Sequence, residues 1–262
     1  MGWRDQLRHI NCTHPEQGIT RISIENPPLN LLTQAVRQEL GTAFEQLQFE
    51  EQTRVVIFGK AHSNFCAGAD LTEFPQRFDP LVALQHGKNA HRMILALLSL
   101  SKPVIALIDG NCMGGGLELA LACDYRIGSN SVRLALPEIK RGVWPGTGGI
   151  FLLQNLVGRA QAHRILLGGN ILDATQAAGL GLLDEHPPQD QLDTRVLEFC
   201  AEIANRPLSS IKTICTLLDH QLLDSFKAHL RFELEQFVQA YQQPAAREGN
   251  LAFFEKRPPQ WH

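Results

Sequence analysis

Short apolar runs, each followed by a stretch with a helical repeat, organise the first half of the chain. The runs at 54–58 and 103–108 do not alternate between apolar and polar residues, which predicts strands covered on both faces. Residues 18–24 do alternate, and predict a strand with one solvent-facing side. Apolar residues at helical spacing predict helices over 33–50 and 80–100. This alternation predicts an α/β layered core.

The second half of the chain has a mainly helical pattern. Its first part predicts two short strands and two helices, at 125–127, 133–135, 150–167 and 173–181. From residue 191 to 256 the pattern is almost entirely helical, with breaks at Pro207 and Pro244. The chain is therefore expected to place helices after an α/β core.

Three consecutive glycines, Gly114 to Gly116, join the strand at 103–108 to a short buried helix at 117–123. The first N–H groups of a helix have no partner within it, and they carry partial positive charge. Glycine also lets a ligand approach them closely. The segment is therefore a candidate site for an anion, or for an oxygen that becomes one. The alternative is a turn that serves packing alone.

Two glutamates accompany this glycine segment. Glu118 comes three residues after Gly115, which places its side chain on the same helical face as the Gly115 N–H. It stands among leucines and alanines, where a carboxylate is usually paired or functional rather than solvated. Glu138 follows twenty residues later, before the glycine-rich stretch 142–149. Paired carboxylates beside an oxyanion site indicate acid–base chemistry next to a carbonyl group.

A second strand exit, at 59–71, is also rich in small residues. Ala67, Gly68 and Ala69 would let a ligand approach the backbone N–H groups. The alternative is an ordinary turn in which Asp70 caps the following helix. From this segment alone the ordinary turn is favoured.

Composition narrows the class of protein. The net charge is −3 and 19% of residues are charged, without a long block of one sign, so neither nucleic-acid binding nor disorder is indicated. The six cysteines lack C-x-x-C spacing and the ten histidines lack metal-ligand spacing. We find no apolar run of the ~20 residues that a membrane helix needs. With an N-terminus too polar for a secretory signal, a cytoplasmic protein with reduced thiols is expected.

Several segments occur in an order that identifies a family. They are 65–71, 102–104, 109–120, 123–126, 137–138, 142–149, 177–180 and 253–256. Together they resemble the enoyl-CoA hydratase/isomerase (crotonase) family, and the resemblance covers essentially the whole chain. It implies an α/β fold with a spiral-like ββα core in residues 1–200, which carries the active site. It also implies a helical trimerisation region in residues 201–262, and self-association as a trimer or a dimer of trimers.

The resemblance also implies the site residues. The substrate would be an acyl-CoA thioester, with no other cofactor and no metal. Glu118 and Glu138 would be catalytic, and the N–H groups of Ala69 and Gly115 would form the oxyanion hole. The path of the CoA and acyl groups would involve the following residues: Ala67, Gly68, Asp70, Leu71, Gly114, Trp144 and Lys256. Lys256 would reach a CoA phosphate of a neighbouring subunit. Trp144 and Phe74 are expected to narrow the acyl pocket, with core packing as the alternative for both.

Glutamates at both positions favour hydration of a 2-enoyl thioester to the 3-hydroxyacyl thioester. A helix N-terminus near Glu118 would favour its anion, which leaves Glu138 as the acid. The alternatives are an isomerase or another thioester-enolate lyase on the same site, and a non-catalytic acyl-CoA-binding protein. Segment 26–30 has no lysine, and 61–64 lacks the basic residue that some members of the family use against the CoA phosphates. Lys60, Lys88 or Arg92 could take over these contacts; otherwise the substrate could be a carrier-protein thioester.

Overall fold

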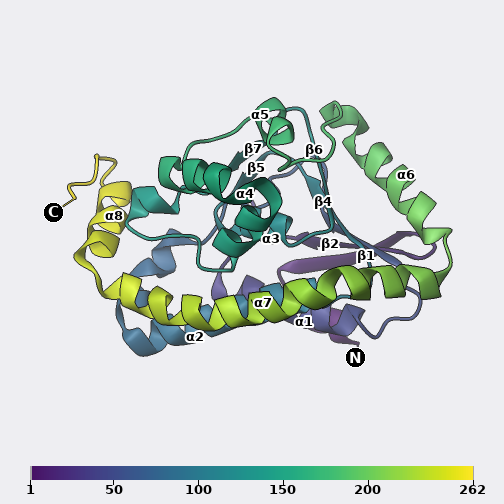
Figure 1. The fold of residues 1–262 in the computed structure, drawn as a ribbon, viewed down its shortest axis with the longest axis horizontal. Coiled ribbons are helices and arrows are strands. Elements are labelled where there is room, and N and C mark those ends of the chain that lie inside the picture. The colour runs from purple at the N-terminus through teal and green to yellow at the C-terminus, as the bar shows by residue number, and fades with distance from the viewer. Residues whose placement is uncertain (1, 262) are drawn as a thin grey trace.

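The apolar runs of the first half of the chain form a mixed five-stranded sheet (Figure 1). The computed structural model describes residues 2–261. The sheet has the order β1-β2-β3-β4-β6; β1 is antiparallel to β2, and the other neighbours are parallel. The strands are β1 (Ile10–Glu16), β2 (Ile19–Ile24), β3 (Val55–Gly59), β4 (Val104–Ile108) and β6 (Tyr125–Gly128). The structure thus confirms the four strands predicted at 18–24, 54–58, 103–108 and 125–127, and it adds β1 to their sheet.

Helices cover both faces of this sheet. Alternate residues of β3 belong to two separate apolar clusters, one of which packs against α6 (Leu192–Ala204). The other cluster includes α1 (Gln34–Leu47) and α2 (Pro80–Leu98). In it Phe58 meets Phe44 edge-to-face, with 5.5 Å between the ring centroids. Because both faces are covered, β3 and β4 are buried along their whole length, as their uninterrupted apolar runs predict.

A second, smaller sheet follows β4. Its two parallel strands are β5 (Asn111–Met113) and β7 (Arg133–Ala135). Helix α3 (Gly115–Leu121) packs on β5 and α5 (Ala174–Gly179) on β7, while α4 (Gly149–Gly168) packs on α3. Every residue of α3 is buried. The chain therefore passes from β4 through β5 directly into a buried helix, at the three consecutive glycines.

The C-terminal part is helical, and its breaks fall at the two predicted prolines. Helix α7 (Leu208–Gln242) begins after Pro207, and α8 (Pro244–Phe254) begins at Pro244. Helix α7 spans much of the length of the protein, and part of it runs alongside α2 (Figure 1). The division between residues 1–200 and 201–262 would fall within α6, and it stays a prediction.

Two expectations from composition can be compared with the structure. All six cysteines are free, and all but Cys12 are buried. Within residues 2–261, no helix combines the length and the apolar character required to cross a membrane.

Candidate active site

The two strand exits rich in small residues meet at one place. Gly68 has a φ of +98° and Gly114 a φ of +51°, backbone conformations that side chains disfavour. Their backbones also pack closely. A methyl group added at Gly68 would lie 2.9 Å from the carbonyl oxygen of Met113, and one at Gly114 would lie 3.9 Å from the Gly68 Cα. The absence of side chains therefore lets the two exits form one wall.

Two N–H groups at this junction, those of Ala69 and Gly115, donate to no protein acceptor within residues 2–261. Gly115 is the first residue of α3, so its N–H has no partner inside the helix. Both residues line a cavity of about 250 Å³. The two N–H groups are therefore available to an oxygen atom of a ligand in this cavity.

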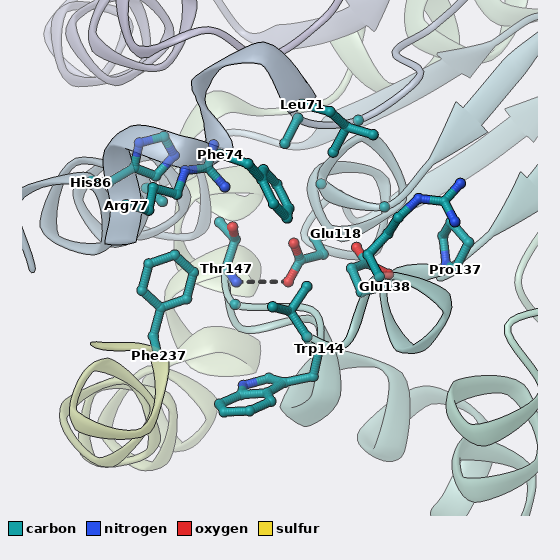
Figure 2. Close-up of a pocket in the computed structure, with 18 of the residues that line it drawn as sticks. Leu71, Phe74, Arg77, His86, Glu118, Pro137, Glu138, Trp144, Thr147 and Phe237 are labelled. Atoms are coloured by element: carbon teal, nitrogen blue, oxygen red, sulfur yellow. Dashed lines mark hydrogen bonds between the residues drawn. The ribbon is translucent and has the colours of Figure 1, made fainter. Parts of the chain in front are cut away.

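Glu118 extends from α3 into the same cavity and is only 2% exposed. Its Oε1 accepts hydrogen bonds from the N–H groups of Thr147 (2.7 Å) and Gly149 (2.9 Å), the first of which is drawn in Figure 2. A methyl group added at Gly115 would lie 3.8 Å from its Oε2. Burial, and then the charge of Glu233, raise the pKa of Glu118 to about 7, although the two N–H bonds oppose the shift.

Glu138 reaches the cavity from the other side of Gly114. It begins a 3₁₀ turn, Glu138–Arg141, and a methyl group added at Gly114 would lie 2.8 Å from its Oε1. The residue is half-buried, yet its Oε2 is inaccessible and has no hydrogen-bond partner in the described chain. Burial, and then the charge of Glu118, raise the pKa of Glu138 to about 8.

Two backbone N–H bonds oppose the rise in the pKa of Glu118, but they do not come from the helix that the sequence suggested. The N–H groups that stabilise the Glu118 anion come from Thr147 and Gly149, at the start of α4, rather than from the helix that carries Glu118. The helix N-terminus that favours the Glu118 anion is therefore that of α4.

A third carboxylate, that of Glu233, also accepts a hydrogen bond from the backbone at the start of α4. The N–H of Gly148 donates to Oε1 of Glu233, at 2.9 Å, between the two N–H groups that bind Glu118. His91 and His229 also contact Glu233, at 3.0 and 3.3 Å. Burial favours the neutral form of Glu233, but the hydrogen bonds from His229, His91 and Gly148 outweigh it and lower its pKa. Glu233 therefore sets a fixed negative charge behind Glu118.

The structure brings most of the predicted site residues to one cavity (Figure 2). Besides the two glutamates and the two N–H donors, the cavity wall includes Ala67, Gly68, Leu71, Gly114, Trp144 and Phe74. Asp70 is not part of the wall; its carboxylate caps the turn that follows, accepting from the N–H of Thr72 at 2.9 Å. Lys256 is exposed after the end of α8 and lies outside this cavity. The roles assigned to all these residues stay predictions.

Sequence reasoning missed one group of residues on the cavity wall: Arg37, Arg77, His86, Phe237 and Tyr241. They come from α1, α2, α7 and the 3₁₀ segment Leu71–Phe78. His86 is one of the ten histidines that lack metal-ligand spacing, and it is buried on this cavity wall. Nothing in the local sequence distinguishes a buried arginine from a solvated one, so only the fold could show this group.

Two further features of the structure concern metal binding and the residues considered for contacts with the CoA phosphates. Within residues 2–261, no group of three or more His, Cys, Asp or Glu side chains is arranged to hold a metal ion. Lys60 is paired with Glu25 at 3.2 Å, and Arg92 with Glu45 at 2.5 Å. Arg141, however, lines the cavity.

Comparisons with known proteins agree with this geometry. The family model described as enoyl-CoA hydratase/isomerase matches residues 14–262. A "probable enoyl-CoA hydratase" of Bacillus subtilis is 30% identical over 94% of this chain and 96% of its own. The mitochondrial "enoyl-CoA hydratase domain-containing protein 2" of mouse is 33% identical over 95% of this chain and 86% of its own.

A solved structure shows the same fold. The enoyl-CoA hydratase of Mycobacterium avium subsp. paratuberculosis superimposes with a TM-score of 0.87, over 98% of this chain and 99% of its own, at 24% identity. The sheet, the glycine-rich exits and the C-terminal helices thus form a crotonase-type α/β fold. With a matching family model over nearly the whole chain, the protein belongs to the enoyl-CoA hydratase/isomerase family.

Proposed function

We propose that this protein is an enoyl-CoA hydratase, which adds water across the 2,3 double bond of a 2-enoyl-CoA. One observation carries the proposal. Two carboxyl groups with raised pKa values, Glu118 and Glu138, flank the Gly114–Gly115 backbone, beside two N–H groups that have no protein acceptor. An acid, a base and an oxyanion site are the groups that hydration of an enoyl thioester requires.

The N–H groups of Ala69 and Gly115 would bind the thioester oxygen. As water adds to C3, negative charge moves onto this oxygen, and the fixed N–H groups stabilise it without reorganisation. Each such donor typically contributes about 3–4 kcal/mol to the transition state. The close packing of Gly68 on Gly114 would keep the two donors at a constant separation.

Glu118 and Glu138 would hold one water molecule between them. Glu118, as the anion, orients the water and accepts one of its protons as the oxygen bonds to C3. Glu138, as the acid, delivers a proton to C2. The pair titrates as a unit, and the N–H bonds to Glu118 favour the arrangement in which Glu138 keeps the proton.

Substrate binding would use the rest of the wall. We propose that Ala67, Gly68 and Leu71 line the pantetheine path, with Asp70 near the CoA adenine and Gly114 close to the thioester. Lys256 would contact a CoA phosphate of a neighbouring subunit, consistent with its exposure outside its own cavity. The CoA thioester is the substrate, and no further cofactor takes part. A cytoplasmic location also stays a proposal, since the mouse relative is named as mitochondrial.

The direct test is to follow the absorbance of the conjugated enoyl thioester in crotonyl-CoA and longer 2-enoyl-CoAs. We expect the absorbance to fall as 3-hydroxyacyl-CoA forms. A product with a shifted double bond would show that the protein is an isomerase rather than a hydratase. If the thioesters bound without any reaction, the protein would be a non-catalytic member of the family.

Glu233 should control the pH dependence of this activity. In Glu233→Gln, the negative charge that helps to raise the pKa of Glu118 is removed, while an oxygen remains for the Gly148 N–H. The pKa of Glu118 should fall, so the acidic limb of the kcat/KM profile should move to lower pH. Glu235→Gln, at an exposed position of the same helix, should leave the profile unchanged. An acidic limb that stays in place in Glu233→Gln would contradict this coupling.

Self-association is the remaining part of the proposal. Helices α7 and α8 expose several large apolar side chains: Ile214, Leu217, Leu218, Phe232, Leu251, Phe253 and Phe254. Such surfaces in a water-soluble chain mark contact sites with other molecules. We expect light scattering after size exclusion to give three or six times the 29.2 kDa chain mass. A monomer at micromolar concentration would contradict a trimeric assembly.

A further inference from the structure

Two arginines stand on the cavity wall away from the carboxylates. Arg37 is 4% exposed and Arg77 is 2% exposed, and both line the cavity, as does the buried imidazole of His86. Figure 2 shows Arg77 and His86 on one side of the cavity and Glu138 on the other, with the Phe74 ring between Arg77 and Glu118. This part of the wall, formed by Arg37, Arg77 and His86, is called the basic end below.

The hydrogen-bonding capacity of the basic end is largely unused. Arg77 donates from Nη1 to the Tyr241 hydroxyl at 2.8 Å, and Arg37 donates from Nη1 to the carbonyl of Leu32 at 2.5 Å. Four other nitrogens are buried without a partner in the described chain: Nε of Arg37, Nε and Nη2 of Arg77, and Nε2 of His86. Buried polar groups are almost always hydrogen-bonded, so this accumulation needs a reason.

The charge of the basic end is also only partly compensated. Glu73 is the carboxylate nearest the two arginines, but it is 3.9 Å from each, beyond hydrogen-bond distance. Burial, and the proximity of the two guanidinium groups, keep His86 neutral by lowering its pKa. Two cations and one carboxylate leave one buried positive charge. A buried charge of this kind is costly to keep unpaired.

We propose that the basic end binds a carboxylate at the far end of the acyl group, so that the substrate is a 2-enoyl-CoA of a dicarboxylic acid. The proposal rests on the proposed thioester function, and it names the acyl class that this site takes. The thioester carbonyl would lie at the N–H groups of Ala69 and Gly115. The carboxylate would lie at Arg77, whose planar guanidinium can donate two parallel hydrogen bonds.

The rest of the cavity suits such an acyl group. Apolar side chains, including Phe74, Ala90 and Phe237, also line the cavity and would contact the methylene groups. The volume of about 250 Å³ lies below the roughly 300–1,000 Å³ of drug-sized pockets, which favours a short chain. Arg77 is also held in place by stacking, because its guanidinium carbon lies 4.6 Å from the centre of the Phe74 ring.

Binding of saturated thioesters tests the proposal without depending on catalysis. Calorimetry would compare succinyl-CoA with butanoyl-CoA, glutaryl-CoA with pentanoyl-CoA, and adipoyl-CoA with hexanoyl-CoA. The members of each pair differ only in ending with a carboxylate or a methyl group. We expect at least one carboxylated thioester to bind about 10- to 100-fold more tightly than its partner, as a hydrogen-bonded charge pair permits. Hydration of the corresponding 2-enoyl-CoAs should show the same order of kcat/KM.

Substitution assigns the preference to the basic end. In Arg77→Met the preference for the carboxylated thioester should disappear, while the affinity for the methyl-ended thioester stays the same. Arg195→Gln removes an arginine that is paired with Glu185 outside the cavity, and should keep the preference. The comparison within the wild-type protein needs no variant, so it holds even if Arg77→Met does not fold.

The other outcomes overturn the proposal in distinguishable ways. Equal affinity within every pair would reject the carboxylate site and leave the thioester function intact. A preference that persists in Arg77→Met would reject the assignment to this arginine. If no thioester bound at all, the proposed function would fail, and this inference with it.

Discussion

Replacing Glu138 by glutamine should lower the hydration rate by about 100- to 10,000-fold, the usual contribution of a general acid or base. Glutamine keeps the shape of the side chain and can still hold the water, but it has no proton to deliver to C2. Glu118→Gln should cause a loss of the same order, because an amide cannot accept a proton from water. Steady-state kcat with the best 2-enoyl-CoA measures both effects, and the affinity for saturated acyl-CoA should hardly change.

The pH dependence of stability should separate a catalytic loss from a structural one. In the folded protein the pKa of Glu138 is raised to about 8, from an ordinary value near 4.5. The folded chain therefore binds more protons than the unfolded chain across this window, and its stability falls as the pH rises through it. Glu138→Gln lacks this carboxyl group, so its melting temperature relative to that of the wild type should increase from pH 5 to pH 9.

Two results would contradict this account of the glutamates. Near-wild-type turnover in either glutamine variant would remove that residue from the catalytic step. A Glu138→Gln protein that became less stable than the wild type as the pH rose would show that the carboxyl group is not held in a costly, buried position. The second result would also remove the reason for assigning it as the acid.

The parts of the site that are local in sequence could be predicted from the sequence. Where a strand ends in glycine and leads into a buried helix, the direction of the first N–H groups of that helix is fixed, whatever surrounds them. The spacing from Gly115 to Glu118 likewise fixes which face of α3 carries the carboxylate. The segment Ala67–Ala69 was ambiguous by itself. The resemblance favoured it as a site, and the structure places it against Gly114.

The parts that depend on distant contacts could not be predicted. Glu118 receives its N–H donors from Thr147 and Gly149, about thirty residues later, and its neighbouring charge from Glu233, more than a hundred residues later. Arg77 is buried because Tyr241 of α7 covers it. Strand β1 has one buried residue and lies at the sheet edge, so it has no apolar pattern to detect.

Gly116→Ala should unfold or severely weaken the junction that holds the two N–H donors. A methyl group at this position would lie 2.3 Å from the carbonyl oxygen of Cys66 and 2.8 Å from its Cβ. Cys66 cannot move away easily. Its carbonyl accepts from the N–H of Met113 at 2.9 Å, and its own N–H donates to Asn111 at 3.0 Å. We expect a loss of about 3 kcal/mol or more in the free energy of unfolding, at the upper end for an overpacked core.

Hydration should fall together with stability in this variant, because moving Cys66 shifts Ala69 away from Gly115. Losing one oxyanion donor typically costs about 100- to 1,000-fold in turnover. Gly179→Ala is the matched control. Its added methyl group would meet no atom within 4 Å, and in helix α5 it should be neutral or slightly stabilising. Urea unfolding and kcat would be measured on both proteins. A Gly116→Ala enzyme with wild-type stability and turnover would show that the two strand exits can separate without loss, and that the oxyanion site does not depend on their close packing.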